Sequence, residues 1–228
     1  MVGIVLAAGC GRRIGAPKAL LPLPGGRTFL EAVLDGLEAA RPEAVVVVVG
    51  PWWEEAAPRE ARSAEAWPAP LPPPRLPPGV VLAVNPDPDR GQVTSIRCGL
   101  AAAGVEWSGA VLALVDHPLV RPATYAALAA AHEETPDLIV VPVVARDAAA
   151  APPGAAGRRG HPVVFPEWAF AELAGPAADA GGARAVVRGN ASRVRELAVD
   201  DPWILVDVDT REGYLDMMDR SGRAAGGP

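Results

Sequence analysis

Three cations in a glycine-rich segment near the N-terminus are the residues best suited to bind phosphate. Residues 6–18 have the sequence LAAGCGRRIGAPK, which carries Arg12, Arg13 and Lys18, and Lys18 is the only lysine of the 228-residue chain. Glycines leave backbone N–H groups free to approach an anion. The glycine spacing G-x-G-x-x-x-G is not the dinucleotide fingerprint, and the residues around Lys18 do not form a Walker A loop. The segment therefore indicates a triphosphate site, with a structural turn and solvated arginines as the alternative.

Carboxylates in two distant segments are candidate ligands of a divalent cation. Asp116 follows the apolar run 110–115, while Asp207 and Asp209 follow a predicted strand near the C-terminus. Alternation in an extended segment turns Asp207 and Asp209 the same way. Magnesium prefers carboxylate oxygens and usually takes one or two of them at sites of phosphoryl transfer. We expect Mg²⁺ as the cofactor, with a solvated strand end as the alternative for the second acidic pair.

Short β-branched runs that alternate with alanine- and leucine-rich stretches predict an α/β fold. The strands are nearly all apolar, as burial between helices on both faces of a largely parallel sheet requires. Thr28 and Glu31 have the spacing of a capping box, and Thr94 or Ser95 is placed to cap the next helix. Predicted strands cover residues 2–6, 44–49, 80–84, 110–115, 138–143, 161–165 and 203–206, and predicted helices cover 28–40, 93–103, 122–134, 168–174 and 183–189.

Composition excludes several classes of protein. Half of the residues are hydrophobic, and a chain of this length buries roughly 70% of its unfolded surface, so an independent core is expected. No apolar stretch reaches the roughly 18 residues of a membrane-spanning helix. The net charge of −6 argues against a nucleic-acid footprint. Cys10 and Cys98 show no paired spacing, and no basic region precedes the first strand, so a reducing, cytoplasmic location is expected.

Proline marks an inserted loop. Residues 67–79 have the sequence WPAPLPPPRLPPG, which suits neither a helix nor a central strand. A PxxP ligand is the alternative to a plain spacer. We expect one domain over residues 1–219, with a proline-rich insertion over 54–79 and a disordered tail over 220–228.

Two further segments carry polar groups beside predicted strand ends. Residues 85–100 provide a glycine turn at Gly91 and hydroxyls at the start of a helix, where a second anion or a ribose could bind. Residues 157–163, GRRGHPV, place two arginines and a histidine in one loop, which is suited to a phosphorylated acceptor that carries a ring. The alternatives are an ordinary capped helix and a structural histidine.

The first of these motifs resembles the signature of the MobA-like nucleotidyltransferases, in particular the molybdenum cofactor cytidylyltransferase branch. Residues 6–18 are similar to LAAG-x-S-x-R-M-G-x-x-K, with Gly11 in place of the serine and Ile14 in place of the methionine. The pair Ala7-Ala8 is similar to the cytidylyl branch, whereas the guanylyl branch has LAGG. The resemblance therefore implies CTP as the nucleotide.

Later motifs extend the resemblance over almost the whole chain outside the insertion. Residues 85–100 are similar to N-P-x-W-x-x-G-M-x-x-S-L-x-x-G-L, with proline for tryptophan and glutamine for methionine. Residues 116–118, DHP, stand where the family has D-Q-P or D-M-P, and His117 is expected to pack beside the site without chemistry. Residues 157–163 match G-x-x-G-H-P, and 181–184 partly match G-x-G-A-R.

The resemblance implies a fold and a set of site residues. The fold is a single three-layer α/β/α domain with a mostly parallel mixed sheet, Rossmann-like and similar to GT-A. Residues 207–210 resemble D-I-D-T, in which one acid completes magnesium coordination, and Asp209 is favoured over Asp207. The implied catalytic residues are Lys18 and Arg13; the nucleotide-binding residues are Leu6, Ala7, Ala8, Gly9, Gly11, Arg12, Gly15, Asn85, Gly91 and Ser95; the acceptor-binding residues are Arg159, Gly160, His161, Pro162 and Arg184; and the metal ligands are Asp116, Asp209 and Asp207.

The implied reaction is transfer of CMP from CTP to molybdopterin, with release of pyrophosphate and formation of molybdopterin cytosine dinucleotide. CTP and molybdopterin are the expected small-molecule partners, and a molybdoenzyme or its chaperone is a further possible partner. Alternatives are a GTP-dependent enzyme, a sugar-phosphate acceptor, or a cofactor-binding insertion partner without chemistry.

Overall fold

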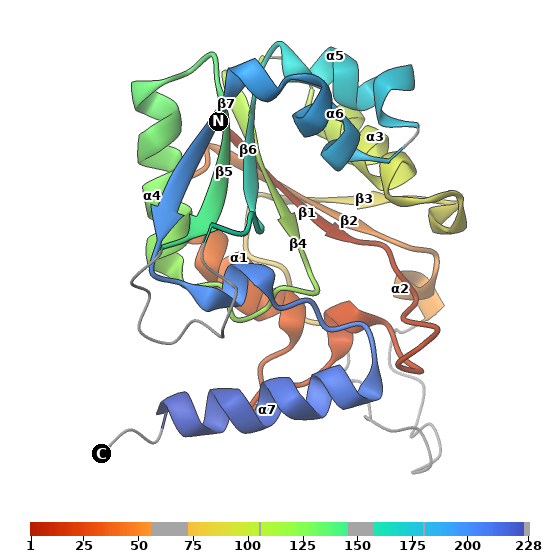
Figure 1. Cartoon of the computed structure of the whole chain (residues 1–228). Coiled ribbons are helices and arrows are strands. Elements are labelled where there is room, and N and C mark those ends of the chain that lie inside the picture. The colour runs from red at the N-terminus through yellow and green to blue at the C-terminus, as the bar shows by residue number, and fades with distance from the viewer. Residues whose placement is uncertain (56–72, 105, 146–156, 180, 226–228) are drawn as a thin grey trace.

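A seven-stranded sheet with helices on both faces forms the centre of the described chain (Figure 1). The computed structural model describes residues 1–55, 73–104, 106–145, 157–179 and 181–225. The strands are β1 (Val2–Ala7), β2 (Ala44–Val49), β3 (Val80–Val84), β4 (Gly109–Leu114), β5 (Ile139–Val144), β6 (Val163–Pro166) and β7 (Val194–Val199). The helices are α1 (Phe29–Glu38), α2 (Trp52–Glu55), α3 (Gln92–Ala103), α4 (Pro122–Glu134), α5 (Ala169–Ala174), α6 (Ala183–Gly189) and α7 (Arg211–Ala225), with short 3-10 helices η1 (Lys18–Leu20), η2 (Pro88–Arg90), η3 (Pro176–Ala178), η4 (Ala191–Arg193) and η5 (Pro202–Leu205).

The strand order places several chain segments at one edge of the sheet. The order is β3-β2-β1-β4-β6-β5-β7, and β6 alone among these strands runs antiparallel to its neighbours. This arrangement confirms the predicted mostly parallel mixed sheet. The carboxyl ends of β1 and β4 therefore lie at the same edge as the amino end of β6, and the loops at this edge carry the predicted site residues.

Two apolar cores, one on each face, hold the three layers together. In β1, Val5 and Ala7 belong to the core that α1 and α4 cover, while Ile4 and Leu6 belong to the core that α3, α5 and α6 cover. The alternation follows from the period of two in a strand. Because both faces of β1 are buried, its position and that of the loop after it are fixed by packing on both sides.

The capping box at Thr28 is confirmed. The Thr28 side chain accepts a hydrogen bond from the Glu31 backbone N–H at 3.1 Å, and the Glu31 carboxylate accepts from the Thr28 backbone N–H at 2.6 Å. Such a cap is worth about 1 kcal/mol. It defines the start of α1, whose Phe29 stacks on Tyr214 of α7 with ring centroids 6.1 Å apart.

The predicted strand over residues 203–206 is wrong, because these residues mostly belong to the 3-10 helix η5. Pro202 has no N–H to donate to a sheet, and the Asp201 carboxylate caps the turn by accepting from the Trp203 backbone N–H at 3.1 Å. The edge position of the sheet is taken by β7, which the sequence analysis missed. Arg195 and Glu196 interrupt the apolar pattern of β7, and they pair with Glu134 and Arg159 at 2.7 Å each.

The predicted tail also needs correction, since α7 continues through Arg220 to Ala225. Arg220 lies 3.5 Å from the carboxylate of Asp216 one turn earlier, and its guanidinium lies 4.8 Å from the centroid of the Trp203 ring. These contacts favour a helix, as does the three-residue spacing of Tyr214 and Met217, which places both on the side that faces the core. Residues 226–228 lie outside the described residues. Of the predicted insertion, residues 54–55 end α2, 73–79 form neither helix nor strand, and 56–72 also lie outside the described residues.

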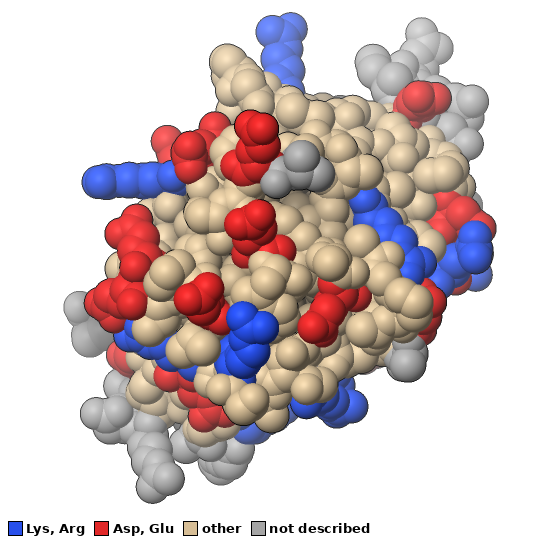
Figure 2. All heavy atoms as spheres, turned by 90° about the horizontal axis from the view of Figure 1, so that it is seen from above, with Lys and Arg blue, Asp and Glu red and all other residues tan. Residues whose placement is uncertain are grey.

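Acidic side chains are spread over the face shown in Figure 2, with arginines set singly among them. This face carries no continuous basic patch of the kind that binds nucleic acid. Among the described residues, no helix combines the length and apolar character needed to cross a bilayer. Cys10 and Cys98 are free cysteines.

Candidate active site

The loop after β1 is shaped by glycines whose conformations other residues rarely adopt. Gly11 and Gly15 have φ of 63° and 87°. The Gly11 carbonyl accepts from the backbone N–H groups of Ile14 and Gly15 at 3.0 and 2.8 Å, which closes a tight turn. A Cβ on Gly11 would lie 1.8 Å from the carbonyl oxygen of Ala16. This turn therefore requires glycine at position 11.

Lys18 connects the two predicted acidic segments. Its Nζ donates to Oδ2 of Asp116 at 2.9 Å and also to Oδ1 of Asp209, although the three residues come from η1, the end of β4 and the segment after η5. The backbone N–H of Val208 donates to the carbonyl of Asp116 at 3.0 Å, which holds the two acidic segments side by side. The side chain of Lys18 is only 15% exposed. The three residues therefore form one partly buried charged cluster.

Charges within this cluster stabilise one another. Burial alone would lower the pKa of Lys18, but the negative charge of Asp116 and the hydrogen bonds that Lys18 donates to both aspartates outweigh it and raise the pKa above 10.5. Burial likewise opposes ionisation of Asp209, yet Lys18 and Arg13 lower its pKa below 3.8. The cluster therefore places the Lys18 ammonium between Asp116 and Asp209.

The two arginines of the loop are also ion-paired. Arg13 donates to Oδ2 of Asp209 at 2.8 Å, and Arg12 donates to the carboxylate of Asp89 in η2. Both arginine side chains are mostly exposed. All three cations predicted to bind phosphate thus contact carboxylates in this structure.

Asp207 does not share the position of Asp209. Residues 206–209 are not part of a strand, so the expected alternation does not apply. Asp209 reaches Lys18 and Arg13, whereas Asp207 lines a separate cavity on the side of His117. The shared orientation expected for the two aspartates is therefore wrong: Asp209 shares Lys18 with Asp116, whereas Asp207 lines the larger cavity together with Asp116.

The loop between β3 and α3 is held by Asn85. This residue is 1% exposed, and its amide donates to the hydroxyls of Thr94 at 2.8 Å and Ser95 at 2.9 Å, while its Oδ1 accepts from the backbone of Asp87. Helix α3 begins at Gln92 with Gly91 (φ 104°) at its N-cap, so neither Thr94 nor Ser95 caps it as expected. The hydrogen bonds of the Asn85 side chain therefore stabilise the conformation of this loop.

A smaller cavity of about 210 Å³ lies between the loop after β1 and the start of α3. Four of the predicted nucleotide-binding residues line it together with Lys18 and Asp116, whereas Ala7 is buried within β1. Gly11, Arg12 and Arg13 line an adjoining hollow of about 220 Å³. The smaller cavity is lined by Leu6, Ala8, Gly9, Lys18, Pro88, Gln92, Ser95, Leu114, Val115 and Asp116.

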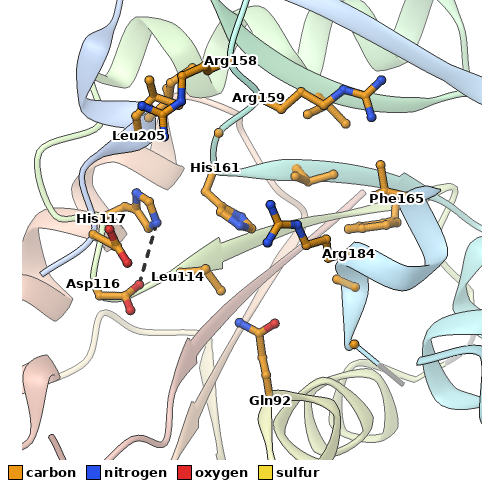
Figure 3. A pocket seen from close by; sticks show the side chains of 18 of the residues that line it. Gln92, Leu114, Asp116, His117, Arg158, Arg159, His161, Phe165, Arg184 and Leu205 are labelled. Carbon is orange, nitrogen blue, oxygen red and sulfur yellow. Dashed lines mark ion pairs between the residues drawn. The ribbon is translucent and has the colours of Figure 1, made fainter. Parts of the chain in front are cut away.

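A larger cavity of about 510 Å³ lies on the other side of Asp116 (Figure 3). The predicted acceptor residues Arg159, Gly160, His161 and Arg184 line it, and the buried Pro162 leads into β6. Its walls share Gln92, Leu114 and Asp116 with the smaller cavity. A nucleotide in one cavity and an acceptor in the other would therefore meet at Asp116.

The histidine of the GHP motif is fixed by its backbone. The His161 N–H donates to the carbonyl of Ile204 at 3.0 Å, and the Gly160 N–H donates to Pro142 at 2.9 Å. A Cβ on Gly160 would lie 2.3 Å from the carbonyl oxygen of Ile204, so this contact requires glycine. The motif thus packs directly on η5, the element that precedes Asp207 and Asp209.

His117 and His161 form a buried pair with ring centroids 5.2 Å apart. Burial lowers the pKa of His117, and burial together with the positive charge of a protonated His117 lowers the pKa of His161 to about 4. Both rings are therefore neutral at pH 7. His117 was expected only to pack beside the site, but it lines the larger cavity, with its Nε2 at 4.0 Å from Oδ1 of Asp116.

The carboxylates of Asp116 and Asp209 are suited to bind a divalent cation. Oδ1 of Asp116 is buried and has no hydrogen-bond partner among the described residues, while Oδ2 and the Asp209 carboxylate already surround a cation, the ammonium of Lys18. No group of three or more His, Cys, Asp or Glu side chains in the described ranges is arranged to hold a metal. Two carboxylates with substrate phosphates suffice for magnesium.

Sequence reasoning missed several residues of the larger cavity. Gln92 and Phe165 line it, as do Arg158 and Arg188. The signal for Arg188 was present, because it follows Arg184 by four positions on a predicted helix and so shares its face. Gln92 and Pro88 were noted only as departures from the similar motif, yet both line the smaller cavity.

Comparison with known proteins gives consistent results. Residues 3–195 match the family described as the MobA-like NTP transferase domain. A protein named probable molybdenum cofactor guanylyltransferase from Rhodopirellula baltica is 31% identical over 142 residues, which cover 62% of this chain and 60% of that protein. The match therefore spans less than two thirds of that relative's length. Nicotine blue oxidoreductase from Paenarthrobacter nicotinovorans is 30% identical over 213 residues, 93% of each chain.

A solved structure is similar over nearly its whole length. The crystal structure of Rv0371c from Mycobacterium tuberculosis H37Rv in complex with manganese superposes with a TM-score of 0.66 and 28% identity, and the match covers 96% of this chain and 97% of that one. That relative is thus known with a divalent metal.

Proposed function

Because the chain belongs to the MobA-like NTP transferase family, we propose that it transfers the CMP group of CTP to the phosphate of molybdopterin carrying its metal, the molybdenum cofactor, and releases pyrophosphate. The observation that carries this proposal is the position of Asp116. It lies in the walls of both cavities, directly beside Lys18. This arrangement suits a reaction in which two phosphorylated substrates approach from opposite sides.

The reaction requires one bond to form and one to break. A phosphate oxygen of the acceptor attacks the α-phosphorus of CTP, and the bond from that phosphorus to the oxygen bridging the β-phosphate breaks. Pyrophosphate leaves with the electron pair, so no side chain needs to become covalently bound. Positioning and charge stabilisation supply most of the catalysis in such transfers.

Asp116 and Asp209 are the residues that would hold Mg²⁺, with Asp207 as the less favoured alternative. Bound magnesium neutralises the charge of the phosphates that approach one another. The unpartnered Oδ1 of Asp116 supports this assignment. Manganese in the solved relative supports a divalent cation without distinguishing the two metals.

Lys18 and Arg13 are the proposed catalytic cations. Both contact Asp209, and Lys18 also contacts Asp116, so both are placed beside the proposed metal ligands. Their charges would stabilise the transition state and the leaving pyrophosphate. Arg12 and the backbone N–H groups of Gly9 and Gly11 lie in the same loop and would bind the remaining phosphate oxygens, whereas the Gly15 N–H already donates to the Gly11 carbonyl and only shapes the turn.

The choice of CTP rests on the Ala7-Ala8 pair, which resembles the cytidylyl branch. GTP is the second candidate nucleotide, because the relative from Rhodopirellula baltica is named a guanylyltransferase. A free nucleotide and a phosphorylated pterin are both cytoplasmic metabolites, so the cytoplasm is the proposed location. A molybdoenzyme or its chaperone would then receive the product.

A different chemistry is raised by the relative named nicotine blue oxidoreductase, since that match covers 93% of both chains. A reductase would take electrons from a reduced nicotinamide dinucleotide and pass them to a ring substrate in the larger cavity. A binding partner without chemistry is the third alternative. Neither alternative produces pyrophosphate.

The test is to incubate the protein with Mg²⁺, molybdopterin and each nucleoside triphosphate in turn, and to identify the products by mass spectrometry. We expect pyrophosphate and a cytosine dinucleotide with CTP, and much less product with GTP. A guanine dinucleotide would replace the nucleotide assignment. Oxidation of a nicotinamide cofactor without pyrophosphate would favour the reductase, and binding without any product would favour the binding partner.

A further inference from the structure

Three arginines around the larger cavity have no carboxylate partner in the part of the chain that the structure describes. Arg158, Arg184 and Arg188 line the cavity and make no ion pair with any described residue. By contrast, Arg159 pairs with Glu196 at 2.7 Å, and Arg97 pairs with Asp179 at 2.7 Å. In a chain with a net charge of −6, three unpaired cations on one cavity indicate a place for an anion.

The arrangement of Arg184 and Arg188 has no structural explanation. They are one turn apart on α6 and therefore share a face. Like charges at this spacing destabilise a helix. Both side chains are exposed and neither contributes to the packing of α6, which uses Ala183, Val186 and Val187. A bound anion would remove the repulsion.

His161 supplies an independent observation at the same place. Its Nδ1 is buried and has no hydrogen-bond partner among the described residues. Arg184 extends across the cavity toward the His161 ring (Figure 3). A buried ring nitrogen without a partner destabilises the protein unless a ligand satisfies it. The guanidinium and the ring together offer hydrogen bonds to one small polar group.

This group cannot be the phosphate that reacts. The reacting phosphate must lie beside Asp116 and Lys18, and Figure 3 shows Asp116 on one side of the cavity with Arg184 on the other. Leu114 lies between them and Phe165 lines the same cavity beside Arg184, so both provide apolar wall that suits the body of a ring. The cavity therefore has a reactive end, an apolar middle and a second, basic end.

We propose that the basic end of this cavity binds a second anionic group of the acceptor, an oxyanion held by Arg184 with Arg188 and in contact with His161. The inference rests on the proposed function and defines the acceptor class more closely. The acceptor is a ring-bearing compound with a phosphate at one end and an oxyanion-bearing group at the other. Bidentate contacts from arginine to such oxygens are the strong ones.

Sulfate, a tetrahedral oxyanion, is the probe that tests this site without any turnover. Isothermal titration calorimetry with sodium sulfate, in EDTA and without nucleotide, is run on wild type, Arg184→Met, Arg188→Met, Lys18→Met and Arg41→Met. Arg41 is a matched control, because it precedes the amino end of β2, whereas the cavity lies at the carboxyl ends of β1 and β4. We expect one sulfate per chain, affinity lowered about tenfold by either α6 substitution, and no change in Lys18→Met or Arg41→Met.

Loss of sulfate binding in Lys18→Met with retention in Arg184→Met would place the anion in the loop after β1 and overturn the inference. Equal affinities in all variants would overturn it as well. A kinetic measurement separates this failure from failure of the proposed function. If CTP and molybdopterin carrying its oxo-metal group react, Arg188→Met should raise KM for this metal-bearing acceptor about tenfold and leave KM for CTP unchanged. An unchanged KM for the metal-bearing acceptor would leave the function standing and remove the second anion site.

Discussion

The ammonium of Lys18 is bound to the two carboxylates that a metal ion would also bind. The same carboxylates hold the ammonium that a triphosphate would also bind. The ammonium contacts Asp116 and Asp209, which are the proposed ligands of a divalent cation. A cation bound by these carboxylates would replace Lys18 as their counter-charge, and Lys18 would then be free to bind phosphate. Metal binding and phosphate binding should therefore support each other.

The first prediction is that Lys18→Met separates metal binding from turnover. Removing the ammonium leaves the two carboxylates without their main counter-charge, so Mn²⁺ affinity measured by electron paramagnetic resonance should increase about tenfold. Turnover of CTP with molybdopterin should fall about 10²–10³-fold, because a cation at the transition state is lost. Asp116→Asn removes a proposed metal ligand, so it should lower both the Mn²⁺ affinity and the turnover. Mn²⁺ affinity that falls in Lys18→Met would mean that the lysine only holds the carboxylates in place.

Individual site residues could be predicted where strand ends bring them together. Lys18 and Asp116 were found because the carboxyl ends of parallel strands share an edge. Asp207 was misplaced because its segment does not belong to a strand, and Pro202 was a signal against the strand predicted just before it. Arg188 was missed although its spacing from Arg184 on a predicted helix indicated a shared face, and Arg158 entered only as one of the two arginines of the loop 157–163.

At the scale of elements, the loop after β1 depends on one backbone turn. The second prediction is that Gly11→Ala lowers the free energy of unfolding by about 1–3 kcal/mol, because φ is 63° and a Cβ would lie 1.8 Å from the Ala16 carbonyl oxygen. The displaced loop should also bind CTP more weakly. Urea denaturation and a CTP titration give the two measurements.

Gly9→Ala is the matched stability control in the same loop, since a Cβ at Gly9 meets no atom within 4 Å. Its free energy of unfolding should change by less than about 1 kcal/mol. Equal losses in the two variants would show that the Gly11 turn has no special importance.

Helices with a clear start signal in the sequence were predicted well. The edge strand β7 and the C-terminal helix α7 were not predicted. Helix α4 was placed at its observed bounds, and the Thr28 capping box located the start of α1. Strand β7 was missed because its exposed edge position allows Arg195 and Glu196 within it, so its pattern is not apolar. Helix α7 was missed because its apolar residues are few and its C-terminal part is rich in arginine and glycine.

At the scale of the whole molecule, stability should depend on pH through the histidines. Burial lowers the pKa of His117, His132 and His161 below 6.5, and that of His161 to about 4. The unfolded state therefore binds protons first as the pH falls. Stability should be fully present above pH 6.5 and be lost progressively toward pH 4, with His161 contributing at most about 3 kcal/mol.

The third prediction compares wild type with His161→Gln by urea denaturation from pH 8 to 4, in metal-free buffer. The difference in unfolding free energy between the two proteins should decrease as the pH falls below 6.5. A constant difference over this range would show that His161 has an ordinary pKa.

The overall architecture was the most predictable feature, because strongly apolar strands alternate with helices along the chain. The family resemblance implied a mixed sheet, but that β6 is the antiparallel strand was not predicted, because periodicity does not encode strand direction. The two cavities could not be predicted, since they arise from the way loops of distant strands pack at one edge. The proline-rich insertion remains a prediction over residues 56–72, which lie outside the described residues.

The most direct test of the central claim is transfer of label from [α-³²P]CTP to molybdopterin under single-turnover conditions, in wild type, Asp116→Asn, Asp209→Asn and Asp216→Asn. Asp216 is the control, an exposed carboxylate on α7. The claim that Asp116 and Asp209 form one centre with Lys18 predicts labelled dinucleotide in wild type and Asp216→Asn, and a rate lowered about 10²-fold or more in the other two. Transfer at the wild-type rate in either Asp116→Asn or Asp209→Asn would contradict it.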